Sequence, residues 1–287
     1  MRTALLVALL LSPHDKVFWR GIVDAKFAVP AGESAAALAP ELVTALGDPD
    51  PEMRDDLAFT ILTAWIYEKK LLGPDDLRPV VKTLEGQLEH GIGATGNDDV
   101  LRRSFSALTL SVIAARDNAT PFLTEAEFRT LLDSALRYFH DERDTRGFDA
   151  QKGWVHTAAH TADLLKFLAR NAQLRVADQR RILDALIDKQ RQPGAVFAQG
   201  EDERMARVAI SIARRTDFDR AAFGDWLGAA KTAATFPKTP TVDALRVHQN
   251  VRHLLASLWT ELSVDERPSE SADAARQMLR DTLKTLF

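Results

Sequence analysis

The chain has 287 residues, 46% of them hydrophobic, and no cysteine. It can bury a large core, and it can form no disulfide, thiol nucleophile, iron–sulfur cluster or cysteine-based zinc site. Its 37 basic and 41 acidic side chains give a net charge of −4 with no long block of one sign, which disfavours general nucleic-acid binding because that needs a basic stripe.

The N-terminus joins a basic residue to a short apolar run. Arg2 precedes ALLVALLL at residues 4–11, a pattern typical of an export signal and too short to span a bilayer. The next residues offer no clean small-x-small cleavage site, and a first helix packed on the core is the alternative. We expect a signal segment at 1–12, one helical domain at 13–287, no transmembrane span, and a periplasmic or secreted rather than cytoplasmic location.

Helical periodicity then continues almost without a break. A short amphipathic helix is predicted over residues 16–25, and Ser34 can cap the next one. Capping-box spacing occurs at Thr124 with Glu127 and at Ser263 with Glu266. Further helices are predicted at residues 34–46, 52–70, 75–90, 98–116, 125–140, 154–171, 177–190, 201–215, 220–232, 242–262 and 271–286. No useful alternating strand pattern is present, so the protein is predicted to be all-α.

The helices also repeat. RDDLAFTIL from Arg54, RSFSALTL from Arg103, HTAAHTADLL from His156, RMARVAISIA from Arg204 and RHLLASL from Arg252 are spaced by 49, 53, 48 and 48 residues. LGDPDPEMRDDLAFTIL is similar to the turn and second helix of a HEAT repeat, whose period is about 40 to 47 residues. We therefore predict a right-handed α-solenoid, a HEAT-like stack of about five helix pairs.

Charge, glycine, tryptophan and paired histidines are concentrated in residues 138–168. If residues 154–171 are one helix, His156, His160 and Asp163 fall within roughly 60° of arc on one face. Two imidazoles one turn apart plus a carboxylate could hold a divalent metal ion, although the glutamate of an HExxH motif is absent. Trp154 is interpreted as a packing anchor at the helix start, with a stacking platform as the alternative.

Just upstream, a polar connection could fold back over this helix and supply Glu142, Asp144 and Arg146. In a HEAT-like stack the early residues of the second helices also converge on the concave face. The predicted groove is lined by Arg54, Asp55, Arg103, Ser104, His156, His160, Arg204, Arg207, Asn250 and His253. Residues 91–96 fit GxGxxG, but they follow a helix where a dinucleotide site needs a strand, so we interpret them as a turn.

Several of these segments together resemble the bacterial domain family of unknown function number 2785. They are FWRGIV, LGDPDPEMRDDLAF, DDVLRRSFSALTL and, above all, ERDTRGFDAQKGWVHTAAHTADLL. They cover most of the chain from Phe18 to about Leu168, and the C-terminal third matches more loosely. The resemblance implies a helical, repeat-like bacterial protein, exported in some members, and brings no activity, substrate or cofactor.

Three functions fit this pattern. The first is a binding or interaction module whose groove takes an anionic or polar ligand, such as a small molecule, peptide or carbohydrate. Its ligand-binding residues would be Arg54, Arg103, Ser104, Arg146, Trp154, Arg204 and Arg207. The second is a metal-assisted or acid/base hydrolase with Glu142, Asp144, His156 and His160 as catalytic residues and His156, His160 and Asp163 as ligands of a divalent metal. The third is a purely structural polar network.

Overall fold

The computed structural model describes residues 14–267 and 269–286, so the signal segment predicted at residues 1–12 lies outside the described residues. The protein is all-α, as predicted. The first half contains α1 (Lys16–Asp24), α2 (Ala35–Ala45), a continuous helical rod of η1 (Glu52–Phe59), α3 (Thr60–Thr63) and η2 (Ala64–Glu68), α4 (Pro74–Leu88), α5 (Asp99–Ala119) and α6 (Glu125–Asp141). The second half contains α7 (Thr157–Arg170), α8 (Val176–Arg191), α9 (Glu201–Ala213), α10 (Arg220–Ala234), α11 (Val242–Val264) and α12 (Glu270–Leu283).

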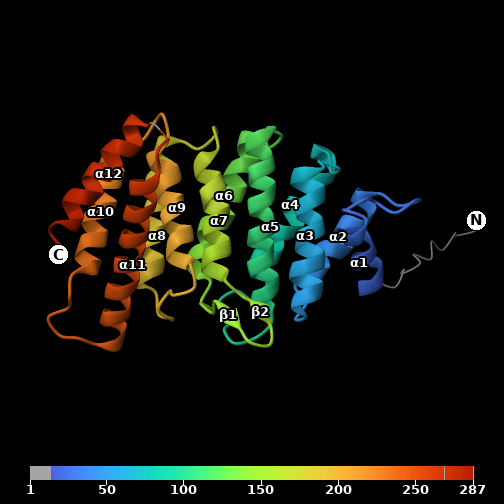
Figure 1. Ribbon diagram of the computed structural model, residues 1–287, viewed down its shortest axis with the longest axis horizontal. Coiled ribbons are helices and arrows are strands. Elements are labelled where there is room, and N and C mark those ends of the chain that lie inside the picture. Colours follow the sequence, from blue (N-terminus) through green and yellow to red (C-terminus); the bar gives the residue numbers. More distant parts are fainter. Residues whose placement is uncertain (1–13, 268, 287) are drawn as a thin grey trace, which may run out of the picture.

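The helices stand side by side in two rows. In one, called the α5 row, the η1–α3–η2 rod, α5, α7, α9 and α11 each pack against the next. In the other, called the α4 row, α2, α4, α6, α8, α10 and α12 do the same. Figure 1 shows the sequence of helices running along the long axis, with α1 and α12 at opposite ends. Each of the five repeated motifs therefore lies in a helix of the α5 row.

The hydrophobic core lies between the two rows. One continuous cluster of buried side chains runs from Trp19 in α1 to Leu279 in α12. In α5, Leu110 and Ile113 are fully buried at the three-residue spacing that puts both on one helical face. Burying each such side chain stabilises the fold by about 1.5–3 kcal/mol. The apolar stripes read from the sequence thus determine which face of each helix packs inward.

Several helix starts follow the capping chemistry predicted from the sequence, and one predicted cap is wrong. The Ser34 hydroxyl accepts from Ala37 N, and Thr124 and Glu127 form the predicted capping box. The box predicted at Ser263 with Glu266 is wrong, because α11 continues to Val264 and the hydroxyl of Ser269 caps α12 instead. Among the described residues, no helix has the length and apolarity that crossing a membrane requires.

A small hairpin is the only β structure in the described chain. Strands β1 (Phe148–Asp149) and β2 (Gly153–Trp154) are antiparallel and two residues long each. They connect α6 to α7 in the chain and lie at the lower ends of α5 and α7 in the view of Figure 1. The prediction of a helix beginning at Trp154 is therefore wrong by three residues, since α7 begins at Thr157.

Candidate functional site

The connection between α6 and α7, residues 142–156, is called the site loop. It folds back on itself, because Val155 N donates to Gly147 O at 2.8 Å and His156 N donates to Arg146 O at 3.0 Å. The hydroxyl of Thr157 donates to Asp144 O at 2.6 Å and fixes the loop on the start of α7. A Cβ at Gly147 would lie 1.7 Å from Gln199 Oε1, so any other residue there would displace the Gln199 side chain.

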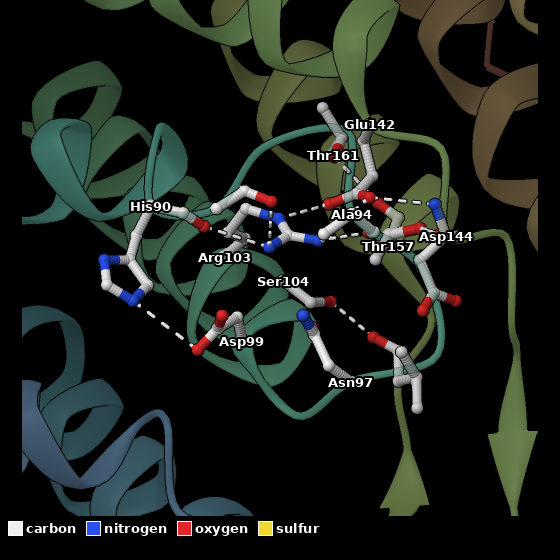
Figure 2. Close-up of polar contacts among 12 residues, drawn as sticks. His90, Ala94, Asn97, Asp99, Arg103, Ser104, Glu142, Asp144, Thr157 and Thr161 are labelled. Atoms are coloured by element: carbon white, nitrogen blue, oxygen red, sulfur yellow. Dashed lines mark hydrogen bonds and ion pairs between the residues drawn. The ribbon is translucent and has the colours of Figure 1, made fainter.

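Arg103 in α5 anchors the first residue of the site loop. Its side chain is fully buried and donates to both carboxylate oxygens of Glu142, at 2.6 Å and 3.1 Å. The same guanidinium donates to the carbonyl oxygens of His90, Gly91 and Ala94, in the turn between α4 and α5. Figure 2 shows it lying between that turn and the site loop. Burial alone would lower the pKa of Arg103, but the bonds to Glu142 raise it on balance.

Asp144 and Arg146 form a second pair within the site loop. Arg146 Nη2 donates to Asp144 Oδ2 at 2.7 Å and to Asn97 O at 2.9 Å. Gly96 N donates to the same carboxylate at 3.0 Å, so the glycine-rich segment is a turn, as predicted, and its amide holds the loop. Burial acts to raise the pKa of Asp144, but these hydrogen bonds lower it overall. The carboxylate stays ionised and is a weak base.

These contacts revise the roles assigned to the loop acids and to Arg103. Arg103 directs its donors at protein acceptors and is 0% exposed, so it reaches no ligand in this conformation. Glu142 is 1% exposed, and among the described residues neither it nor Asp144 is hydrogen-bonded to His156 or His160. Their geometry fits the structural network better than general-base catalysis.

Arg54 in η1 has a similar structural role. It is fully buried, donates to Asp48 O at 2.9 Å and Lys152 O at 2.5 Å, and pairs with Asp55 Oδ1 at 2.7 Å. Its guanidinium also lies 4.7 Å from the ring centre of Phe105. Burial raises the pKa of Asp55 to about 6, against the opposing effect of Arg54. The predicted ligand donor is thus an anchor for the hairpin.

His160 connects α7 to α5. Its Nδ1 lies 2.8 Å from the hydroxyl of Ser104, which also donates to Val155 O. Because the single hydroxyl proton goes to that carbonyl, Nδ1 of His160 is the donor to Ser104. The ring also contacts Phe105 edge-on, with 5.0 Å between ring centres. Burial lowers the pKa of His160 well below its usual value, so the ring is neutral at neutral pH.

His156 precedes α7 rather than belonging to it. Its backbone is left-handed, with φ 52°, a conformation that costs a non-glycine residue about 1–2 kcal/mol. The side chain is 7% exposed, and Nε2 is a buried nitrogen without a hydrogen-bond partner in the described chain. The nearest acid is Glu201, whose Oε1 lies 3.5 Å from Nε2. Burial lowers the pKa of His156, and Glu201 opposes that shift.

Trp154 lies beside His156 and faces solvent. Its ring stacks on the imidazole with 4.6 Å between ring centres, and Phe148 contacts it edge-on at 5.1 Å. Trp154 is 41% exposed and Phe148 is 51% exposed. The interpretation of Trp154 as a packing anchor is therefore wrong: the hairpin turns the indole outward, and the alternative, a stacking platform, fits its position.

The remaining candidates lie along α7 and α9, further from the site loop. Asp163 forms ion pairs with Arg204 and with Lys166, the latter at 2.7 Å. Arg207 pairs with Glu261 of α11 at 2.8 Å. Arg204 and Arg207 keep partly exposed side chains, so these two of the four arginines predicted to line the groove face solvent.

The geometry gives no support to the metal hypothesis. Asp163 is engaged by Arg204 and Lys166, and His160 directs Nδ1 to Ser104. Across residues 14–267 and 269–286, no group of three or more histidine or acidic side chains is arranged to hold a metal ion. His156 and His160 do lie close together, with 5.6 Å between ring centres, and the metal assignment remains a prediction for elemental analysis.

Asn250 and His253 of α11 hold the neighbouring loop instead of lining the site. Asn250 Oδ1 accepts from Phe197 N at 2.9 Å, and Nδ1 of His253 lies 3.2 Å from Phe197 O. In the same loop, the backbone N–H of Gln199 donates to the Glu201 carboxylate, and the side-chain oxygen of Gln199 accepts from Phe148 N at 2.8 Å. The α9 end of the site is thereby fixed to the hairpin.

Sequence reasoning missed Glu201 and Gln199, which complete the surroundings of His156. The only sequence signal for Glu201 was its place at the start of a predicted helix one repeat after His156. It also missed Lys189, a buried lysine that donates to the carbonyl oxygens of Phe139 and Glu142, at 2.8 Å each. Nothing in the local pattern distinguishes that lysine from a surface residue of α8.

Comparison with known proteins gives one match. Residues 88–260 match a family described as "Protein of unknown function (DUF2785)", a range that contains the site loop, His156, His160 and Arg204. No match was found among curated proteins, and none among solved structures.

Proposed function

The chain belongs to the DUF2785 family of proteins of unknown function, so the family assigns no activity to the site. We propose that the protein is a ligand-binding α-solenoid. The proposed ligand is polar and binds beside the β1–β2 hairpin. Its site consists of Trp154, His156 and Glu201, with Asp55 beside them, and is called the Trp154 surface.

The solenoid part of the proposal rests on repetition in sequence and packing. Five times along the chain, a helix of the α4 row is followed by a helix of the α5 row and packs against it. Each helix of the α5 row then packs against the next one, which is how HEAT-like repeats bury their apolar faces. The continuous core from α1 to α12 supports a single repeat domain.

One observation carries the binding proposal: at His156, an unmet side-chain hydrogen bond and a strained backbone occur in the same residue. Its Nε2 is buried and forms no hydrogen bond with a described residue, the Glu201 carboxylate lying 3.5 Å away. An unmet hydrogen bond costs about 1–3 kcal/mol in a folded protein, and the backbone of His156 is left-handed. Strained, unsatisfied residues concentrate at functional sites, where the surrounding structure holds them in place. Because Nε2 is buried, a ligand hydroxyl reaches it only after the neighbouring side chains shift, and it then supplies the missing hydrogen bond.

The neighbouring side chains indicate a carbohydrate as the ligand class. Trp154 offers an exposed indole face next to Phe148, and aromatic faces pack well against the apolar face of a sugar ring. The carboxylates of Asp55 and Glu201 are hydrogen-bond acceptors for sugar hydroxyls. Asp55 lies beside the hairpin, because its Oδ2 would be 3.9 Å from a Cβ at Gly153.

The test is a binding screen with neutral and acidic mono- and disaccharides, followed by titration calorimetry. Trp154→Ala should weaken any saccharide found by about tenfold or more, since it removes the stacking surface. Trp259→Phe, which changes a tryptophan of α11 outside the site, is the matched control and should bind like the wild type. Equal affinity of Trp154→Ala and wild type for a verified saccharide would disprove the assignment.

Fluorescence gives an independent readout on the same protein. Trp19, Trp65 and Trp226 are buried to within 1%, so acrylamide quenching reports mainly Trp154 and Trp259. A bound saccharide should protect the wild type and Trp259→Phe from quenching and should leave Trp154→Phe unprotected. Analysing the same mixtures for hydrolysis products tests the hydrolase alternative.

A further inference from the structure

A second polar site lies at the other end of α7 and α9, away from the Trp154 surface. A pocket of about 440 Å³ there is lined by four arginines together with Ser211, Thr216, Ala172 and Ile210. The arginines are Arg170, Arg214, Arg215 and Arg267, and this site is called the arginine pocket. Because α7 rises about 1.5 Å per residue, its last turn is roughly 20 Å from the site loop.

Charge in the arginine pocket is not balanced by the protein. Arg214 and Arg267 share one carboxylate, that of Asp265, and Arg215 pairs with Asp217. Arg170 forms no ion pair with any described residue, so four guanidinium groups face two paired carboxylates. This leaves an excess of two positive charges around one pocket.

Arg170 is the member best placed for a ligand. Its side chain is partly exposed, and its Nε donates to the Ser211 hydroxyl at 2.9 Å, which orients the guanidinium. The Ser211 hydroxyl itself donates to Arg207 O, so it acts as the acceptor toward Arg170. The terminal nitrogens of Arg170 have no hydrogen-bond partner among the described residues.

The other arginines differ in their freedom to bind. Arg215 is held by the carbonyl oxygens of Ala169, Asn171 and Leu174, where it closes the end of α7. Arg214 and Arg267 each donate a hydrogen bond from Nη2 to the shared Asp265 carboxylate and keep further donors beside it. Burial lowers the pKa of Arg170, as do the positive charges of Arg267 and Arg214, while Asp163 raises it. An anion in the pocket would relieve this crowding of like charges.

We infer that the arginine pocket binds a phosphate group, either as inorganic phosphate or as part of a small phosphate ester. The planar guanidinium matches the oxygens of a phosphate in a two-pronged hydrogen-bonded pair. The pocket also has room for more than the phosphate itself, and Ile210 and Ala172 offer an apolar wall for an attached organic group. An adjoining pocket of about 570 Å³ shares Arg214, Arg215 and Thr216 and adds both Arg220 and the carboxylate of Glu270.

The experiment is titration calorimetry of the full chain with inorganic phosphate and with phenyl phosphate at low ionic strength. Arg170→Gln should weaken binding of both by about tenfold or more, because it removes charge-assisted hydrogen bonds. Arg180→Gln is the matched control, since Arg180 is an exposed arginine of α8 paired with Asp225 outside the pocket. It should bind phosphate like the wild type. Circular dichroism of each variant verifies the fold.

Specific outcomes would overturn the inference. One is an unchanged phosphate affinity in Arg170→Gln. Another is a loss of affinity in Arg180→Gln equal to that in Arg170→Gln, which would mean that phosphate binds by general charge attraction. A second variant, Arg214→Gln, should also weaken binding, and an unaltered affinity there would remove the pocket as the site. Tighter binding of phenyl phosphate than of inorganic phosphate would support the site and identify an ester as its ligand, whereas equal affinities would support free phosphate.

Discussion

Replacing Arg103 with methionine breaks the buried pair that attaches the site loop to α5. The Glu142 carboxylate, 1% exposed, would lose both bonds from the guanidinium and keep the amide of Asp144, at 2.9 Å, as a hydrogen-bond donor. The carbonyl oxygens of His90, Gly91 and Ala94 would lose a donor as well. Removing one partner of a buried ion pair costs about 3–5 kcal/mol. For a chain of this size we expect Tm to fall by roughly 10 °C.

The assay is thermal and urea denaturation followed by circular dichroism. Arg180→Met, in an exposed pair with Asp225, is the matched control and should cost less than about 1 kcal/mol. The double variant Arg103→Met/Glu142→Met should lose less stability than the two single variants combined, because no unpaired charge stays buried. The reasoning is refuted if Arg103→Met is as stable as Arg180→Met.

The other predictions concern Lys189 and bound metal. Burial lowers the pKa of Lys189 from 10.5 to about 8. As the pH rises, the folded state therefore loses this proton before the unfolded state does. The free energy of unfolding of the wild type, relative to that of Lys189→Met, should rise between about pH 8 and pH 10.5. The full change is on the order of 3 kcal/mol; a flat difference in unfolding free energy across that range would contradict the shift. Elemental analysis of tag-free protein purified without chelators should find metal well below one ion per chain, because Asp163 is occupied by Arg204 and Lys166. Stoichiometric zinc, manganese or iron that disappears in His156→Ala/His160→Ala would instead revive the metal-assisted hydrolase.

The sequence indicated many of the residues at the site but not the role of each residue. The repeated motifs placed Arg54, Arg103, His156 and Arg204 at equivalent points of successive helices, and the structure has all of them at the α5 row. Whether such a residue faces solvent is set by what the intervening connections cover. The site loop buries Arg54 and Arg103 beneath it, whereas Arg204, in α9, stays partly exposed.

The sequence by itself determined the all-α class, the order and approximate ends of the helices, and the spacing of the repeats. Those properties depend on apolar periodicity, capping residues and turn residues, which act over a few neighbouring positions. Only the tertiary structure decided that His156 lies outside α7, that Trp154 faces solvent, that Glu201 completes the site and that four arginines meet in one pocket. The position of His156 and the outward indole follow from the fold of the hairpin, where Val155 and His156 bond to Gly147 and Arg146 and Arg54 holds Lys152 from 98 positions away. Glu201 and the arginine pocket depend on contacts between residues about 40 to 50 positions apart, and the energies of such contacts leave no mark on the local pattern.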